Sequence, residues 1–309
     1  MRSFQKGCVD GMLAASMRNR FGVALAVLLA GPVSAAERAA PPTFSATART
    51  VRVPVSVLDE HDEPVLDLRR EDFKVSEDGR RQPLTFFSGE RRPIRIVVAL
   101  DLSLSMTGVM NEVEGALGDF IDLLEPADEI LVITFSDEVY VHGEFTSDRD
   151  LLERVFARLK PAPGTSLYDA ALEAIRRVAP APAESKAVVL VTDGDDTTSD
   201  GRLGDVRELA RQHEVPIFGI GLGGGGGPLR ALAEDSGGRA IILRNAKRTP
   251  GEPDHLKAAA TSIALTLRHR YLLGYDEPDA GKRGWRPIRV EVSRAAVEVH
   301  ARKGYYSAK

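Results

Sequence analysis

Cysteine is almost absent from this sequence, because Cys8 is the only one among 309 residues. A disulfide scaffold and a cysteine-based zinc site are therefore excluded. A strong excess of one charge is also lacking, and the formal net charge of −4 argues against a general nucleic-acid binder. With 43% hydrophobic and 28% charged residues, the composition is that of a soluble globular protein, not of a disordered chain or a collagen-like fibre. The length suits roughly two domains.

Long apolar runs are scarce as well. The clearest one covers residues 21–31 and follows Arg18 and Arg20. It is shorter than the ~20 apolar residues of a transmembrane helix. Small residues at 33–36 come next and resemble a cleavage site. Together these features predict a secretory signal peptide over residues 1–36, with an uncleaved N-terminal anchor as the alternative.

The signal peptide predicts export from a bacterial cell, either to the periplasm or to the outside. The first sixteen residues make the region before the apolar run unusually long and place the acidic Asp10 in it, so Met17 is a candidate for the true initiator. No later segment is apolar enough to cross a membrane, so we expect no transmembrane span after cleavage.

The region after the signal peptide begins with a linker and a β-rich segment. Residues 37–49 form the linker, and residues 50–90 carry the β pattern. Thr50–Leu58 alternates apolar and polar residues, which is typical of a half-buried strand, and Pro54 indicates a sheet edge or a bulge. Further strands are expected at Asp72–Glu77 and Pro83–Phe87, with turns at Asp59–Glu63 and Glu77–Gly79.

Residues 92–268 alternate buried strands with helices. Ile94–Leu100 is a nearly continuous apolar run, as expected of a strand buried on both faces. The later strands are expected at Ile130–Phe135, Val139–Phe145, Ala187–Thr192, Pro216–Gly221 and Arg239–Leu243. The helices are expected at 108–124, Asp148–Leu159, Leu167–Val178, Leu203–Gln212, Pro228–Asp235 and 253–268. This alternation predicts an α/β fold with a doubly wound, mostly parallel sheet.

The β pattern returns in residues 269–309. Strands are expected there at Tyr271–Tyr275, Pro287–Val292 and Val297–Ala301. Because β-rich segments lie on both sides of the α/β region, we expect an α/β domain inserted into one flanking β domain built from the N- and C-terminal segments. Two unrelated β appendages are the alternative.

Oxygen-bearing side chains follow the first buried strand of the α/β region. Asp101, Ser103 and Ser105 occupy alternate positions in the loop after it. Ligands of open α/β sheets lie at the carboxyl ends of the strands, so these three groups can point to one spot. A carboxylate with hydroxyls suits Mg²⁺, whereas Ca²⁺ prefers more carboxylates and zinc prefers histidine or cysteine. Alternatively, Asp101 caps the next helix.

Two further segments are expected at the same edge of the sheet. Asp193 follows the strand that ends at Thr192, and Thr165 lies in a loop just before a helix. The Thr165 hydroxyl can reach the same ion. With both residues in register, a metal site is favoured over a helix cap.

Five residues in this order resemble the metal-ion-dependent adhesion site of von Willebrand factor type A domains. They are Asp101, Ser103, Ser105, Thr165 and Asp193. The resemblance implies that Ser103 and Ser105 bind Mg²⁺ or Mn²⁺ directly and that Thr165 does so in one conformational state. Asp101 and Asp193 would act directly or through water. The last coordination position would take an Asp or Glu from a protein partner.

Much of the chain is similar to a wider group, the bacterial secreted proteins called VWFA-related or acidobacterial-type. The segments that carry this similarity are Pro64–Gln82, Thr165–Ala170, Thr192–Asp196, Arg270–Tyr275 and Ala301–Tyr306. Leu104 departs from the family pattern, which has glycine before the second serine, and this implies a stiffer loop.

The remaining polar motifs do not indicate a second binding site. Asp195, Asp196 and Asp200 are expected to form a solvated acidic loop rather than a second ion site, and Asp169 is expected in the first turn of a helix. The glycine run at 223–227 lacks the Lys-Ser/Thr of a phosphate-binding loop, and the six histidines form no metal-binding motif.

The sequence therefore predicts an exported, metal-dependent protein-binding module and no enzyme. A structural envelope protein stabilised by its ion is the first alternative. A phosphatase-like hydrolase is the second, and it is disfavoured because Ser103 stands where the Asp-x-Asp pattern has its acid/base carboxylate.

Overall fold

The structure is a computed structural model that describes residues 49–223, 226–244, 254–278 and 283–307. The expected signal peptide, and all of the expected linker except Arg49, lie outside the described residues. No helix within the described ranges is long and apolar enough to cross a membrane. The described residues belong to one compact unit, which begins at Thr47.

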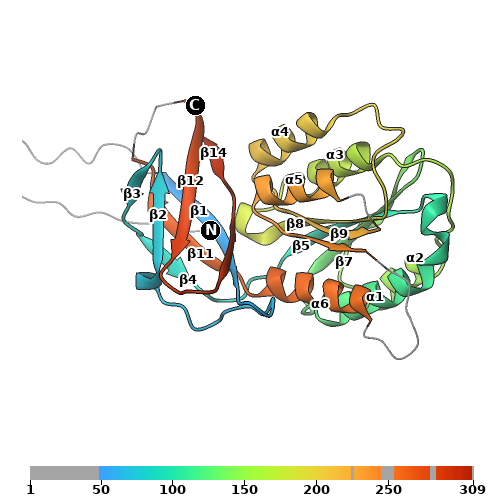
Figure 1. Ribbon diagram of the computed structural model, residues 1–309, viewed down its shortest axis with the longest axis horizontal. Coiled ribbons are helices and arrows are strands. Elements are labelled where there is room, and N and C mark those ends of the chain that lie inside the picture. Colours follow the sequence, from blue (N-terminus) through green and yellow to red (C-terminus); the bar gives the residue numbers. More distant parts are fainter. Residues whose placement is uncertain (1–48, 224–225, 245–253, 279–282, 308–309) are drawn as a thin grey trace, which may run out of the picture. The chain divides into compact units, whose positions relative to one another are not determined.

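A six-stranded sheet forms the centre of the α/β region (Figure 1). In order across the sheet, its strands are β10 (Ala240–Leu243), β9 (Ile217–Leu222), β8 (Lys186–Thr192), β5 (Arg95–Asp101), β6 (Glu129–Phe135) and β7 (Val139–Thr146). All of them run parallel except β7, which pairs antiparallel with β6. The prediction of a mostly parallel sheet is thus confirmed.

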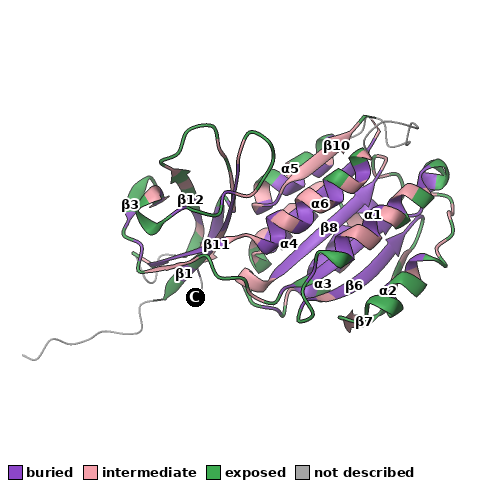
Figure 2. Ribbon diagram, turned by 90° about the horizontal axis from the view of Figure 1, so that it is seen from below, coloured by how far each residue is buried: buried purple, intermediate pink, exposed green. Residues whose placement is uncertain are grey.

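Helices cover both faces of this sheet (Figure 2). One face carries α1 (Met110–Asp122), α2 (Arg149–Phe156) and α6 (His255–Arg268). The other carries α3 (Leu167–Val178), α4 (Leu203–His213) and α5 (Gly227–Ser236). Strand β5 shows why its sequence is apolar throughout: Ile96 and Val98 enter the first core, and Val97 enters the second.

The helix expected at 108–124 is preceded by a short 3-10 helix, η2 (Leu104–Gly108). As a result α1 begins only at Met110. Of two further 3-10 helices, η1 (Arg70–Asp72) lies between two strands of the β-rich part, and η3 (Ala183–Ser185) lies between a helix and a strand of the α/β region.

Two four-stranded antiparallel sheets make up the β-rich part. The first has the order β13 (Glu298–Ala301), β1 (Thr50–Leu58), β11 (Tyr271–Asp276) and β4 (Phe86–Ser88). The second has the order β14 (Gly304–Ser307), β12 (Gly284–Val292), β2 (Phe73–Glu77) and β3 (Arg80–Gln82). Both sheets contribute side chains to one apolar core, which includes Val53, Phe73 and Tyr275.

Strands from the two ends of the chain pair with each other in these sheets. β1 pairs with β11 and β13, and β2 pairs with β12. The predicted fold class, an α/β fold flanked by β structure from both terminal segments, is therefore confirmed. The exact boundaries of the predicted domains stay predictions.

Pro54 lies at a local edge of the sheet but not at a bulge. β1 lies between two strands, and Pro54 pairs with Leu272 of β11 without a shift in register. On the opposite side, pairing with β13 begins only at Val55. A proline has no N–H to donate, and it is tolerated here because one side of its backbone is left unpaired.

The strand expected at Pro83–Phe87 is also misplaced, because β4 begins only at Phe86. The turn that follows β2 leads directly into β3 instead. Its two residues, Asp78 and Gly79, have φ values of 49° and 77°, as in the tight two-residue turns of hairpins. The hairpin therefore closes before Pro83 is reached.

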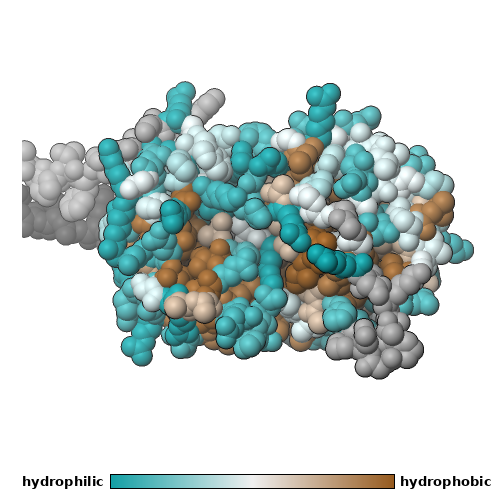
Figure 3. Space-filling model, in the orientation of Figure 1, coloured by the Kyte–Doolittle hydropathy of each residue, from teal (hydrophilic) through white to brown (hydrophobic). Residues whose placement is uncertain are grey.

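Large apolar side chains reach the surface at only a few described positions. Figure 3 shows mostly hydrophilic residues on one face, with smaller hydrophobic areas between them. The exposed large apolar residues within the described ranges are Leu66, Leu104, Leu123, Tyr140 and Leu151. Of these, Leu104 is 58% exposed and stands between two of the predicted metal ligands.

Candidate metal centre

The carboxyl end of β5, in the middle of the central sheet, positions Asp101. This residue ends the strand and is fully buried. Its Oδ2 accepts a hydrogen bond from the Thr192 hydroxyl at 2.6 Å, and its Oδ1 accepts one from the Ser103 backbone N–H at 2.7 Å. Because β8 pairs in parallel with β5, Thr192 arrives at the same edge. The neighbouring strand thus fixes the orientation of the carboxylate.

Three more side chains extend this cluster toward solvent. The Ser105 hydroxyl donates to Oδ1 of Asp193 at 2.8 Å and lies 2.9 Å from the Ser103 hydroxyl. The Ser103 hydroxyl is also 3.5 Å from that Asp193 oxygen. Ser103 is buried whereas Ser105 is exposed, so the cluster opens to solvent. The structure therefore brings four of the five predicted residues together.

The loop that carries Thr165 runs beside the cluster. The Ala162 N–H donates to the Leu102 carbonyl at 2.7 Å, which holds the loop against the segment after β5. Gly164 has a φ of +84°, and a Cβ there would come within 2.8 Å of Asp137, so the tight turn requires glycine. Thr165 itself is nearly buried. Within the described ranges, however, no hydrogen bond joins it to the other four predicted residues.

Within the described ranges, no basic side chain forms an ion pair with either carboxylate of the cluster. Among the ion pairs of the described residues, none includes Asp101 or Asp193. Burial raises the pKa of Asp101, and the nearby charge of Asp193 adds to the rise, against the hydrogen bonds from Thr192 and Ser103. An ionised carboxylate is costly to bury without a countercharge. A bound cation would supply that charge.

The donor set fits a hard divalent cation. Two carboxylates and two hydroxyls offer only oxygen ligands, which suit Mg²⁺ and Mn²⁺. In the described part of the chain, no three His, Cys, Asp or Glu side chains cluster as a metal site. A metal at this edge would therefore depend on the serine hydroxyls as well as on the carboxylates.

Asp101 does not cap the following helix. Helix α1 begins at Met110, and its N-cap residue is Val109. Asp101 instead accepts the Ser103 N–H, which stabilises the loop between β5 and η2. The capping alternative is therefore set aside.

Two threonines support the site in ways that were not predicted from the sequence. Thr192 orients Asp101, but a threonine at the end of a strand is common for reasons of packing. Thr197 accepts the Thr165 N–H at 3.0 Å through its hydroxyl, and the Thr165 carbonyl accepts the Thr197 N–H at 2.9 Å. These bonds fix the backbone of the Thr165 loop.

The acidic residues beside the site stabilise a loop. Asp196 accepts hydrogen bonds from the Tyr168 N–H and from the Ser199 hydroxyl. Asp169 lies in the first turn of α3, as predicted, and accepts the N–H groups of Asp200 and Gly201. The acidic loop is therefore tied to α3.

Comparison with known families identifies the region that holds this cluster. Residues 96–195 match the family described as von Willebrand factor type A domain. The chain contains a von Willebrand factor type A domain. The matched residues include all five of the predicted site, and domains of this type typically mediate contacts between proteins.

Curated relatives match the same part of the chain. The inter-alpha-trypsin inhibitor heavy chain H2 of Mesocricetus auratus is 27% identical over 42% of this chain, and its Homo sapiens counterpart is 26% identical over the same share. The match spans only 16% of the length of each of these relatives.

Solved structures show the same fold. A von Willebrand factor type A protein from Catenulispora acidiphila has a TM-score of 0.51 and 14% identity, over 83% of this chain and 73% of that one. Proximal thread matrix protein 1 from the mussel byssus has a TM-score of 0.51 and 16% identity, over 62% of this chain and 51% of that one.

Proposed function

We propose that this von Willebrand factor type A domain binds a protein partner through Mg²⁺ or Mn²⁺ held at the carboxyl end of β5. The observation that carries the proposal is the buried Asp101, which has no basic partner among the described residues and lies in one hydrogen-bonded cluster with Ser103, Ser105 and Asp193. A cation is the simplest group that would balance two carboxylates placed in this way.

The proposed ligands would have different roles in binding the cation. Ser103 and Ser105 provide neutral oxygens, which bind a cation without cancelling its charge. Asp101, oriented by Thr192, provides a fixed carboxylate. When bound, the cation supplies positive charge and a coordination position for a partner's Asp or Glu. Water is partly excluded at this edge, so such a contact would be stronger than a surface ion pair.

Thr165 is the fifth ligand that we propose. Its loop lies along the segment after β5, as the bridge between Ser103 and Ala162 shows. Its backbone is held by Thr197. We propose that its hydroxyl joins the other ligands when the ion is bound.

A binding role without catalysis suits this site better than a hydrolase. Both oxygens of Asp101 accept hydrogen bonds and its side chain is fully buried, which makes it a poor nucleophile. Ser103 lacks the acid/base carboxylate that an Asp-x-Asp hydrolase uses. We also propose that the protein is exported from a bacterial cell, and this rests on the sequence of residues 1–36.

Calorimetric titration of the purified protein with Mg²⁺ and Mn²⁺ tests the metal site. The wild type is expected to bind one ion, and the Ser103→Ala/Ser105→Ala variant is expected to bind none while keeping its fold. Asp195→Asn is the matched control, because this exposed acidic residue lies near the cluster without belonging to it. Absence of binding in the wild type would overturn the metal proposal.

Water-proton relaxation with Mn²⁺ separates a partner-binding ion from a purely structural one. An ion with an open coordination position exchanges water quickly and enhances relaxation. Acetate, a stand-in for a partner's carboxylate, should then lower the enhancement. A bound ion that acetate leaves unaffected would favour the alternative of a metal-stabilised structural protein.

A further inference from the structure

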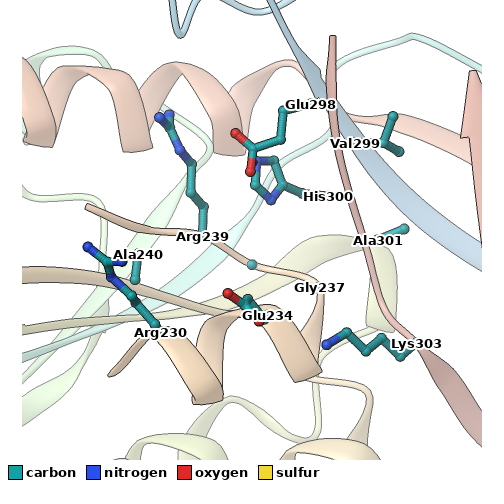
Figure 4. Close-up of a pocket in the computed structure, with 11 residues that line it drawn as sticks. Arg230, Glu234, Gly237, Arg239, Ala240, Glu298, Val299, His300, Ala301 and Lys303 are labelled. Atoms are coloured by element: carbon teal, nitrogen blue, oxygen red, sulfur yellow. The ribbon is translucent and has the colours of Figure 1, made fainter. Parts of the chain in front are cut away.

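A polar pocket of about 430 Å³ lies between the turn from α5 to β10 and the edge strand β13 (Figure 4). None of the predicted metal ligands lines it. Its titratable lining residues are Arg230, Glu234, Arg239, Glu298, His300 and Lys303. Its volume falls within the range of roughly 300–1,000 Å³ that is usual for small-molecule sites.

Two glycines allow the chain to form this pocket. Gly237 has a φ of +85°, and a Cβ there would lie 2.2 Å from the backbone nitrogen of Arg302. A Cβ on Gly238 would lie 2.0 Å from the carbonyl oxygen of Ile217. The turn can therefore pack directly on its neighbours only without side chains. The charged residues stand around this close-packed floor.

One side of the pocket holds two hydrogen-bond acceptors that face each other. Nε2 of His300 is buried, makes no hydrogen bond within the described residues, and lies 3.5 Å from Oε1 of Glu298. Burial lowers the pKa of His300, which keeps its ring neutral at neutral pH. The ring also makes a hydrogen bond with the Gly238 backbone. Nε2 is thus left as an acceptor, but it is closed to solvent, so the exposed Glu298 carboxylate is the acceptor on this side that a ligand's donor can reach.

Another side of the pocket carries a positively charged side chain. The side chain of Arg230 makes no ion pair or hydrogen bond within the described ranges. The other two basic residues are already engaged, since Arg239 pairs with Asp62 and Lys303 lies 3.2 Å from Asp235. In Figure 4 the Glu298 carboxylate points to the His300 ring, and Arg230 lies apart from both. The pocket therefore has separate places for a donor and for an anion.

We propose that this pocket binds a small zwitterion of the amino-acid or short-peptide class. Its ammonium group would pair with the Glu298 carboxylate, and its carboxylate would pair with Arg230. This site is independent of the metal centre, so the failure of either proposal leaves the other standing.

Calorimetric titration of the full chain with L-alanyl-L-alanine tests the proposal. Two analogues each remove one charge of the dipeptide: the N-acetyl form lacks the ammonium, and the C-terminal amide lacks the carboxylate. We expect saturable binding of the free dipeptide and about tenfold weaker binding of each analogue, as for the loss of one charged hydrogen bond. Undetectable binding of the dipeptide, or equal binding of all three, would overturn the proposal.

Variants connect each charge of the ligand with one side of the pocket. Arg230→Gln should abolish the preference for the free carboxylate over the amide, and Glu298→Gln should abolish the preference for the free amine over the N-acetyl form. Arg289→Gln and Glu291→Gln are matched controls, because this exposed ion pair lies on β12 outside the pocket. Unchanged preferences in the two pocket variants would show that the dipeptide binds elsewhere and would contradict the assignment.

Discussion

Two regions of the molecule bury a carboxylate, and they satisfy it in opposite ways. In the β-rich sheets, the fully buried Glu77 accepts two hydrogen bonds from Arg286, at 2.6 and 2.9 Å. Its other oxygen accepts hydrogen bonds from the hydroxyls of Tyr275, at 2.6 Å, and Tyr305, at 3.2 Å. In the central sheet, Asp101 accepts hydrogen bonds from Thr192 and Ser103, with no basic partner among the described residues, and it lies close to a second carboxylate.

The difference distinguishes the Glu77 carboxylate, which pairs with a cation of the fold, from the Asp101 carboxylate, which we propose is available to a bound cation. Glu77 has its countercharge inside the chain. Burial, helped by the neighbouring Glu77, raises the pKa of both Tyr275 and Tyr305, so these phenols stay protonated donors across the physiological range. Asp101 finds no countercharge among the residues that the structure describes, and it lies at an edge that opens to solvent. We therefore expect the Glu77 cluster to matter for stability and the Asp101 cluster to matter for binding.

The closed cluster consists of Glu77, Arg286, Tyr275 and Tyr305. The largest effect is expected from breaking it with Arg286→Met. This change leaves the Glu77 carboxylate buried without its cation, and removing one partner of a buried pair costs about 3–5 kcal/mol. Urea denaturation measures the loss. The double variant Glu77→Gln/Arg286→Met should recover part of it, because no charge is then left unpaired. A loss below about 1 kcal/mol in the single variant, the size typical of a surface pair, would contradict this account.

The open cluster consists of Asp101, Ser103, Ser105 and Asp193. Replacing its buried carboxylate should raise the stability of the fold instead of lowering it. In the absence of divalent ions, Asp101→Asn is expected to raise the free energy of unfolding by about 1 kcal/mol, because it removes an uncompensated buried charge. The Thr192 hydroxyl can turn to accept from the new amide and donate to the Gly194 carbonyl, which is 3.3 Å away. Added Mg²⁺ should stabilise the wild type and not the variant. A large loss of stability without metal would show that Asp101 is a structural residue like Glu77.

The stability that Asp101→Asn adds should decrease as the pH is lowered. The folded-state pKa of Asp101 is raised above the ordinary value of 3.8, so its ionisation destabilises the fold above that pH. The difference in stability between Asp101→Asn and the wild type, measured in EDTA, should therefore shrink as the pH falls toward 4. A difference that widened on acidification would mean that the folded state favours the ionised form.

Thr192→Val should have a smaller effect on stability and a clear effect on the metal. It removes the hydroxyl that orients Asp101, which should cost about 1 kcal/mol and weaken Mg²⁺ binding about tenfold or more. Thr134→Val on β6 is a matched control, because this buried hydroxyl bonds to His142 instead. Equal losses of Mg²⁺ affinity in both variants would show a general effect on the sheet.

The smallest effect is expected from Leu104→Ser. Leu104 is 58% exposed, so the change should alter stability by no more than about 0.5 kcal/mol. Mg²⁺ affinity, measured by calorimetry, should stay the same because the ligands Ser103 and Ser105 are untouched. A several-fold change in affinity would support the idea that leucine, in place of glycine, stiffens the loop.

The sequence predicted the open cluster far better than the closed one. Asp101, Ser103 and Ser105 stand close together after an apolar strand, and parallel strand order brings Asp193 to the same edge. A local pattern combined with a rule of topology was therefore enough to predict that four of the five proposed ligands lie together. The contact of the Thr165 hydroxyl with them stays a prediction.

Glu77 could not be predicted to be buried, because its surroundings in the sequence indicate a turn. Its main partner, Arg286, lies 209 residues away along the chain. The pairing of β2 with β12 brings the two together. No local sequence pattern predicts this pairing. Thr192 is a similar case, since its hydroxyl gains a role only through the neighbouring strand.

Anomalous diffraction from a crystal soaked in Mn²⁺ and acetate tests the central contrast most directly. Mn²⁺ is visible by its anomalous signal, and acetate can fill the coordination position proposed for a partner's carboxylate. The account predicts a peak bounded by Ser103, Ser105 and Asp193, and none at Glu77. An empty cluster at saturating Mn²⁺ would contradict the claim that Asp101 is left open for a cation.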